Sequence, residues 1–113
     1  MKRNFITIQV LALITAGQVV TAGAEERVII EALANKNSCF QCHGTDKNGV
    51  GPSFRNVAEK YKNDARARDT LIEIMKNGGK GNWTEISRGV PMPPYRSLSD
   101  EEIKRLVEWV LSH

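Results

Sequence analysis

Two cysteines and a histidine form the most reactive group in the sequence, Cys39-Phe40-Gln41-Cys42-His43, and the chain has no other cysteine. This spacing of thiols and imidazole is compatible with several kinds of site. A structural zinc site needs four ligands, and His113 is the only other histidine available to complete one. A thioredoxin-like dithiol goes with a βαβ pattern, which the sequence lacks. A disulfide closing so short a loop adds little stability, and none of these three interpretations uses His43.

A fourth interpretation uses all three side chains. Two cysteines separated by two residues add across the two vinyl groups of a haem, and the histidine that follows ligates the iron; this is the attachment pattern of c-type haem. We therefore predict one covalent haem c, bound through Cys39 and Cys42, with His43 as an iron ligand.

The candidates for the second iron ligand are Met75, Met92 and His113. Met75 falls on the apolar face of a predicted helix and is interpreted as core. Met92 lies in Val90-Pro91-Met92-Pro93-Pro94, where the prolines exclude helix and fix an extended backbone. A large apolar side chain on so stiff a segment favours a thioether ligand over core packing. Ligation by His43 and Met92 predicts a relatively positive reduction potential.

The chain that must position these residues is predicted to be all-α. Apolar residues recur at helical spacing over 26–34, 54–61, 68–76 and 103–111. Asn77-Gly78-Gly79 is expected to end the third helix, and Ser99 with Glu102 predicts a capping box at the start of the last one. No segment shows sustained two-residue alternation, so the predicted architecture is about four short helices around a central group.

Two connections carry the candidate site. Residues 44–53 hold three glycines and a proline and are predicted to form a loop. Residues 78–98 hold four glycines and then three prolines, and they are predicted to form an irregular connection. A structureless loop of that length is unusual in a small domain unless it is functional.

The first 24 residues predict a secretory signal peptide. A positive start is followed by an apolar stretch from Phe5 to Ala16, and Ala22-Gly23-Ala24 suits signal peptidase. We predict cleavage after Ala24, a single domain over residues 25–113, and a soluble periplasmic protein. An uncleaved membrane anchor is the alternative, but the apolar stretch is shorter than the roughly 20 residues that span a bilayer.

Charge argues against one large class of function. The chain has 16 Lys and Arg against 13 Asp and Glu, a net charge of +3, and two of the cations, Lys2 and Arg3, lie in the predicted leader. The predicted mature domain is nearly neutral and has no long run of one sign, so nucleic-acid binding is not expected. Ordinary solvated charge is favoured over a docking patch for the loop cations Lys36, Lys47, Lys80, Arg88 and Arg96.

With these motifs the chain resembles the class I c-type cytochromes, in particular the small bacterial monohaem cytochromes of the periplasm. The resemblance covers most of residues 26–112. It rests on Cys39-Phe40-Gln41-Cys42-His43, Val50-Gly51-Pro52, Lys76-Asn77-Gly78-Gly79, Gly81-Asn82-Trp83, Pro91-Met92-Pro93-Pro94 and Trp109-Val110-Leu111, in that order. It implies that the first and last helices cross and pack on each other.

The resemblance also implies roles for single residues. The carbonyl of Pro52 is expected to accept the second ring N–H of His43. The indole of Trp83 is expected to donate to a haem propionate, with core packing as the alternative. The chain departs from the shortest family members at residues 84–89, which form a longer stretch, and at Tyr95, where close relatives often have asparagine. A hydroxyl contact to Met92 or a propionate, and packing against the haem edge, are both open for Tyr95.

The predicted function is one-electron transport without enzyme activity, because iron held on both sides has no position open to a substrate. The expected partners are donor and acceptor proteins of a respiratory chain, which a monomer meets through a small, weak contact. Two alternatives remain. One is a haem subunit docked to a larger respiratory redox enzyme, and the other is a catalytic or gas-sensing haem protein in which Met92 does not bind the iron.

Overall fold

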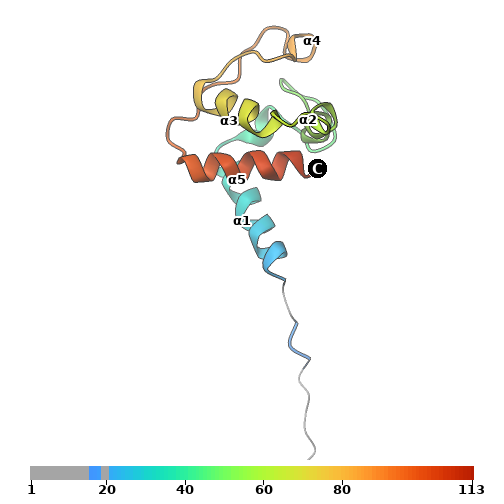
Figure 1. Cartoon of the computed structure of the whole chain (residues 1–113), viewed down its shortest axis with the longest axis vertical. Helices are drawn as coiled ribbons and strands as arrows, with labels where there is room; N and C mark the ends of the chain where they lie inside the picture. Colours follow the sequence, from blue (N-terminus) through green and yellow to red (C-terminus); the bar gives the residue numbers. More distant parts are fainter. Residues whose placement is uncertain (1–15, 19–20) are drawn as a thin grey trace, which may run out of the picture.

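Helices dominate the computed structural model, which describes residues 16–18 and 21–113 (Figure 1). In chain order they are α1 (Ala22–Lys36), the 3₁₀ helix η1 (Cys39–Gln41), α2 (Phe54–Tyr61), α3 (Ala67–Asn77), α4 (Thr84–Ser87) and α5 (Asp100–Leu111). The β pairing in this part of the chain is limited to two isolated bridges, His43 with Asn48 and Gly79 with Met92. The predicted all-α class is confirmed.

The predicted helices match the observed ones unevenly. Helix α2 has the predicted bounds, α3 is one residue longer at each end than 68–76, and α1 extends well beyond 26–34. About four short helices were expected, and the described residues form five α-helices, because residues 84–87 of the predicted irregular connection form the single turn α4. A single turn is too short to show an apolar stripe with a period of 3.6 residues.

The ends of α3 and α5 follow from local chemistry. Ser99 Oγ accepts the N–H of Glu102 at 3.1 Å, and Glu102 Oε2 accepts the N–H of Ser99 at 2.8 Å, so the predicted capping box is present. Helix α3 ends at Asn77, where Gly78 turns the chain with φ of 72° and donates its N–H to the carbonyl of Ile74 at 2.7 Å. At Gly78 the chain therefore leaves the axis of α3 and enters the connection formed by residues 78–98.

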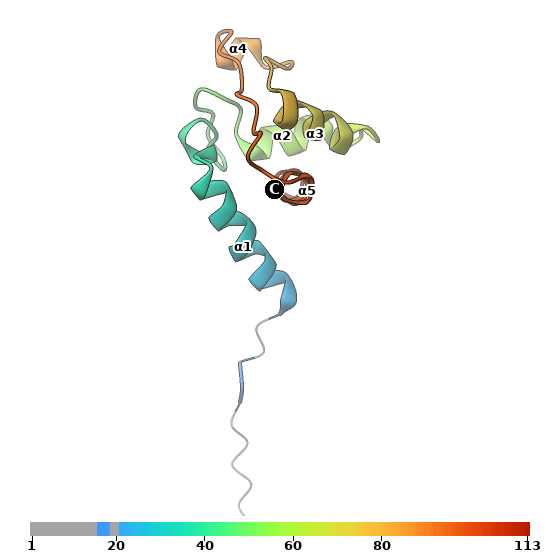
Figure 2. The ribbon, with the colours of Figure 1, turned by 90° about the vertical axis from the view of Figure 1, so that its left-hand side faces the viewer.

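Helix α5 is the central element, since α1, α2 and α3 all pack on it. Figure 2 views α5 end-on while α1 runs across the picture, so the first and last helices cross, as the resemblance implies. Their contact buries Ile30 and Ala34 against Ile103, Leu106 and Val107. Each fully buried aliphatic side chain of this size contributes about 1.5–3 kcal/mol, so this crossing anchors η1, which follows α1 directly.

The predicted leader falls mostly on residues outside the described range, and only Ala22-Gly23-Ala24 of its proposed cleavage site is seen as the first residues of α1. Among the residues that are described, no helix combines the length and the apolar character needed to cross a bilayer.

Candidate functional site

One tight turn brings the two thiols and the imidazole together. Ser38 adopts a left-handed conformation with φ of 60°, and η1 follows. The carbonyl of Cys39 accepts the N–H of Cys42 at 3.2 Å and that of His43 at 3.0 Å. Both cysteines carry free thiols; Cys39 is buried and Cys42 is half-buried. Burial raises the pKa of the Cys39 thiol.

The His43 ring is fixed by a hydrogen bond to the chain. Its Nδ1 lies 2.6 Å from the carbonyl oxygen of Pro52, the contact that the resemblance implies. A carbonyl only accepts, so Nδ1 carries the proton and Nε2 keeps the free lone pair that a metal needs. The ring stacks on Phe54, with centroids 5.5 Å apart and planes at 21°.

The loop 44–53 holds the Pro52 carbonyl in place. Gly51 donates its N–H to the carbonyl of Cys42 at 2.8 Å, and Asn48 Oδ1 accepts the N–H of Ser53 at 2.8 Å. Gly51 also lies close to the imidazole, because a Cβ at this position would stand 2.6 Å from Cε1 of His43. The ring and the loop are therefore positioned by one another.

Met92 is fixed from the other side of the molecule. It exchanges two backbone hydrogen bonds with Gly79, of 2.8 and 3.0 Å. The N–H of Tyr95 reaches the carbonyl of Met75 in α3 at 2.8 Å. These bonds tie the proline-rich segment to the C-terminal end of α3.

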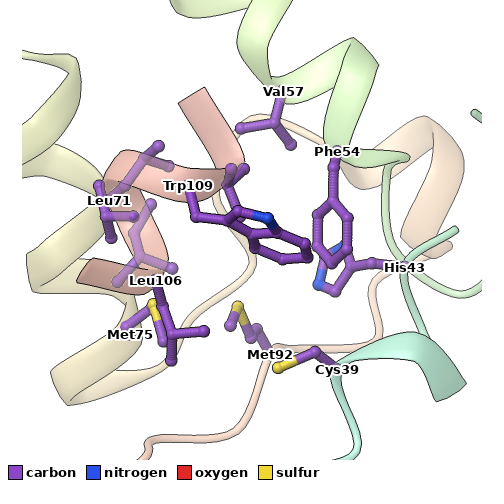
Figure 3. A pocket seen from close by; sticks show the side chains of 12 residues that line it. Cys39, His43, Phe54, Val57, Leu71, Met75, Met92, Leu106 and Trp109 are labelled. Carbon is purple, nitrogen blue, oxygen red and sulfur yellow. The ribbon is translucent and has the colours of Figure 1, made fainter. Parts of the chain in front are cut away.

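Two cavities of about 80 and 260 Å³ lie between these elements, and both are lined by His43 and Met92. Figure 3 shows the smaller one, with the side chains of Cys39, Met92 and His43 beside the rings of Phe54 and Trp109. The larger cavity is lined by the other candidate residues, Cys42, Pro52 and Trp83, together with Tyr95. All six predicted site residues thus border one or both of these cavities, which share part of their lining.

The walls of both cavities are mainly apolar. Val57, Leu71 and Ile74 line both, and of all their lining residues only Lys80 is charged. An imidazole nitrogen, a thioether and two thiols around an apolar space are the donor set of a covalently attached haem. A metal ion held by side chains alone fits less well, since no group of three or more His, Cys, Asp or Glu gathers anywhere in residues 16–18 and 21–113.

The two other candidate iron ligands, Met75 and His113, make contacts that are typical of structural residues. Met75 is buried in the main core cluster, although it also borders the smaller cavity. His113 lines neither cavity; its Nδ1 lies 2.9 Å from the carbonyl of Trp109, and its ring packs edge-on against that indole.

Trp83 is half-buried at the start of α4, where the Lys60 Nζ lies 4.2 Å from its ring centroid. Burial raises the pKa of Tyr95, and the nearby Cys39 and Cys42 add to the effect. Of the loop cations considered as a docking patch, only Lys80 lines the larger cavity. The other four do not line it: Lys36, Lys47, Arg88 and Arg96.

Sequence reasoning missed several residues of this site. Phe54 and Trp109 form the aromatic wall of the smaller cavity, with ring centroids 5.0 Å apart. The sequence indicates only a helix face for Phe54 and only a family motif for Trp109. Ser87 lines the larger cavity from α4. Helical periodicity around Phe54 indicates burial without indicating what is buried, and a lone serine gives no signal at all.

An all-α fold with a C-x-x-C-H turn facing a methionine on a proline-stiffened loop defines a class I c-type cytochrome. The cytochrome c family model matches residues 29–113, so the chain belongs to the cytochrome c family.

Relatives of known name support this assignment. The chain is 46% identical over 83 residues to cytochrome c-551 of Azotobacter vinelandii, covering 74% of this chain and 95% of that protein. It is 37% identical over 102 residues to cytochrome c-551 of Pseudomonas aeruginosa, covering 90% and 92%. The crystal structure of Nitrosomonas europaea cytochrome c552 matches with a TM-score of 0.64 and 35% identity, covering 73% and 96%. The prosthetic group of this family is a covalently bound haem c, and its members carry electrons.

Proposed function

We propose that this chain is a soluble periplasmic one-electron carrier whose haem iron is held between His43 Nε2 and the Met92 sulfur. One observation carries the proposal: the two side chains border the same cavities. Each of them is also fixed by hydrogen bonds, at the ring for His43 and at the backbone for Met92.

Fixed ligands suit electron transfer. When bound, haem c supplies a ferric–ferrous couple that changes by one electron. The Pro52 carbonyl holds the His43 ring, and the Gly79 pairing holds Met92, so neither side chain needs to move when the charge changes. The apolar wall of Val57, Leu71 and Ile74 disfavours added positive charge and so favours the reduced state.

The two thiols fix the group along one edge. On attachment each thiol would add across a vinyl group: the S–H bond and the vinyl π bond would break, one carbon–sulfur and one carbon–hydrogen bond would form, and no atom would leave. Cys39 and Cys42 reach that edge from the same turn, directly beside His43. Attachment at this turn therefore also sets which face of the group meets the imidazole.

A weak contact with redox partners is supported by the rim of the larger cavity. Val50 and Val90 are both exposed there, and Lys80 is the one charged residue on its wall. A small, mostly apolar contact of this kind is typical of transient electron-transfer encounters. The partners are an electron donor and an electron acceptor, and the carrier is a monomer between encounters.

Export is part of the proposal. It is supported by the charged start, the apolar stretch and the small residues of Ala22-Gly23-Ala24. Cleavage after Ala24 would leave Glu25 in the first turn of α1. A carboxylate at this end of a helix interacts favourably with the helix dipole. The N-terminal sequence of protein purified from the periplasm checks this point directly.

The test of the ligand set is the spectrum of the ferrous holoprotein with and without carbon monoxide. A carrier with both positions filled shows no prompt change at neutral pH. Met92→Ala is the positive control, because it opens one position and should bind the gas at once. Prompt binding by the unaltered protein would contradict the proposal and favour the gas-binding alternative.

Size exclusion of the native protein tests the docked-subunit alternative. Co-elution with a larger enzyme would favour that alternative.

A further inference from the structure

Ser87 carries a buried hydroxyl without a partner. This last residue of α4 is 8% exposed, and its Oγ meets no hydrogen-bonding atom in the part of the chain that the structure describes. Its backbone is fully used, since its N–H donates to Trp83 at 2.8 Å and its carbonyl accepts from Val90 at 2.9 Å. An unpaired hydroxyl away from water is costly, so this group calls for an explanation in the holoprotein.

The surroundings of Ser87 point to an anionic acceptor. It lines the larger cavity together with Lys80 and Trp83, which supply an ammonium group and an indole N–H from the same short segment. None of the residues lining that cavity is acidic. Lys60 adds a further positive charge, because its Nζ lies 4.2 Å from the Trp83 ring and bonds the carbonyl of Asn82 at 3.1 Å. Hydrogen-bond donors and positive charge thus belong to the lining of this cavity and to its immediate neighbour Lys60.

The chemistry of haem supplies an acceptor for these donors. Haem carries its two carboxylates on the edge of the ring that lies away from the vinyl groups. A haem attached through Cys39 and Cys42 would have its vinyl edge at their turn, which directly follows α1. Figures 1 and 2 agree that α4 lies beyond α3, on the side of the molecule opposite α1. A haem bound through Cys39 and Cys42 would have its carboxylate edge turned away from these two residues, and Ser87, Lys80 and Trp83 are among the hydrogen-bond donors in the lining of the same cavity.

We propose that the Ser87 hydroxyl donates a hydrogen bond to a haem propionate, and that α4 serves to present it. This rests on haem occupying the larger cavity, as in the function proposed above. The hydroxyl keeps its proton and the ionised carboxylate accepts, so no bond is made or broken. Ser87 acts as a positioning residue for the haem, beside the Trp83 indole that the family resemblance assigns to the same group.

One internal acceptor competes with the propionate. A serine within a helix can turn its hydroxyl to the carbonyl four residues earlier, which for Ser87 is that of Trp83. That arrangement would satisfy the hydroxyl without any contact to haem. The two arrangements place the hydroxyl proton beside different neighbours, and this difference decides between them.

The direct test is proton NMR of the ferrous holoprotein, which is diamagnetic when both iron positions are filled. We expect a Ser87 hydroxyl resonance that exchanges slowly with water and shows a nuclear Overhauser effect to the propionate methylene protons. An effect to Trp83 alone, or a rapidly exchanging hydroxyl, overturns the proposal.

The second measurement is the thermal midpoint of Ser87→Ala holoprotein. Loss of one hydrogen bond in a domain of this size lowers the midpoint by about 4–8 °C. Ser112→Ala is the matched control, since its exposed hydroxyl bonds the Trp109 carbonyl and lies outside the larger cavity. An unchanged or higher midpoint for Ser87→Ala means that the hydroxyl has no partner and contradicts the proposal. A lower midpoint without the propionate contact assigns Ser87 a purely structural role and also contradicts it.

The iron ligands are checked separately in the same sample. The sulfur-to-iron charge-transfer band of the ferric protein reports Met92 and not Ser87. A retained band with no propionate contact rejects the role of Ser87 alone. A missing band in the unaltered protein rejects the proposed ligand set, and the Ser87 contact is then read from the NMR spectrum of the ferrous carbon monoxide complex, in which both iron positions are filled.

Discussion

Met92 and Gly79 face each other as an antiparallel pair and exchange both backbone hydrogen bonds, the N–H of Met92 at 2.8 Å and that of Gly79 at 3.0 Å. This pairing joins the proline-rich segment that carries Met92 to the residues that directly follow α3. The turn that makes the pairing possible is Gly78, whose φ is 72° and whose ψ is −178°. The position of the proposed thioether ligand therefore depends on a glycine fourteen residues earlier in the chain.

Gly78→Ala should loosen the Met92 ligand. The backbone conformation of Gly78 is nearly exclusive to glycine and costs other residues about 1–3 kcal/mol. A Cβ there would also stand 2.7 Å from the Met92 carbonyl oxygen and 3.0 Å from the Pro94 nitrogen. We expect a destabilised holoprotein in which part of the ferric population lacks the sulfur-to-iron charge-transfer band.

Gly89→Ala is the matched control for this substitution. Gly89 has a positive φ of 82°, but apart from its two sequence neighbours no atom of the described residues lies within 4 Å of its added Cβ. It should show the backbone cost without the loss of the band. Equal loss of the band in both variants would mean that crowding at Met92 is not the cause.

Gly51→Ala should displace the His43 imidazole. The added Cβ would lie 2.6 Å from Cε1 and 2.9 Å from Nδ1, so the ring must move away from the Pro52 carbonyl. A weaker hydrogen bond at Nδ1 makes the imidazole a less basic ligand, which favours ferrous iron and raises the reduction potential. Voltammetry and the Nδ1 proton resonance measure the two effects.

The control for Gly51 lies in the same loop. In Gly49→Ala the added Cβ would approach the Cys42 carbonyl at 2.8 Å and not the imidazole. This variant should lose stability while the Nδ1 proton resonance stays in place. A shifted resonance in Gly49→Ala and an unchanged one in Gly51→Ala would reverse the assignment.

Cys42→Ala should leave little or no mature holoprotein. The thiol is only half-buried, so its loss removes one attachment bond and little of the apolar core. A small domain whose central space is meant for a bound group depends on that group for its core. Haem staining of periplasmic extracts, with an antibody signal for total chain, measures the yield. Normal yield and normal stability of Cys42→Ala would show that haem is not needed to complete the core.

Much of the fold could be predicted because the evidence for it is local. The apolar spacing of residues 54–61 gave α2 its observed bounds, and Ser99 with Glu102 gave the start of α5 through a motif of four residues. The thiols and imidazole of the site follow from one five-residue motif. In each case the residues that form the structure are neighbours in the sequence.

Other features could not be predicted because they depend on distant parts of the chain. The hydrogen bond from His43 to Pro52 came from a resemblance, since the spacing of nine residues says nothing about where the loop turns back. Helix α4 is too short to carry a periodic pattern. The burial of Ser87 arises because α4 folds over a cavity built by residues far from it in sequence.

Ser99→Ala should destabilise the protein by about 1 kcal/mol, the usual cost of losing an N-cap side chain. Two hydrogen bonds are affected at the start of α5, the helix on which the other three long helices pack. Ser97→Ala is the control, because Ser97 is exposed and precedes the cap. Chemical unfolding followed by circular dichroism gives both values. Equal, negligible effects would show that the capping box contributes nothing in solution.

Tyr61→Phe should change how stability depends on alkaline pH. Burial in the cluster with Val57 and Ala67, and then the negative charge of Asp64, raise the pKa of Tyr61 above its ordinary value near 10. The unfolded chain therefore releases this proton at a lower pH than the folded chain does. The contribution of Tyr61 is complete below about pH 10 and is lost as the pH rises through the higher folded-state pKa.

Unfolding by denaturant at a series of pH values tests this sign. The stability difference between the unaltered protein and Tyr61→Phe should be constant below about pH 9 and should move in favour of the phenylalanine variant above pH 10. Asp64→Asn is the control, because it removes the smaller cause and leaves burial in place, so most of the alkaline loss should remain. A difference that stays constant to high pH would mean that Tyr61 ionises equally easily in both states, and the packing of α2 against α5 around this ring would need to be looser than the structure shows.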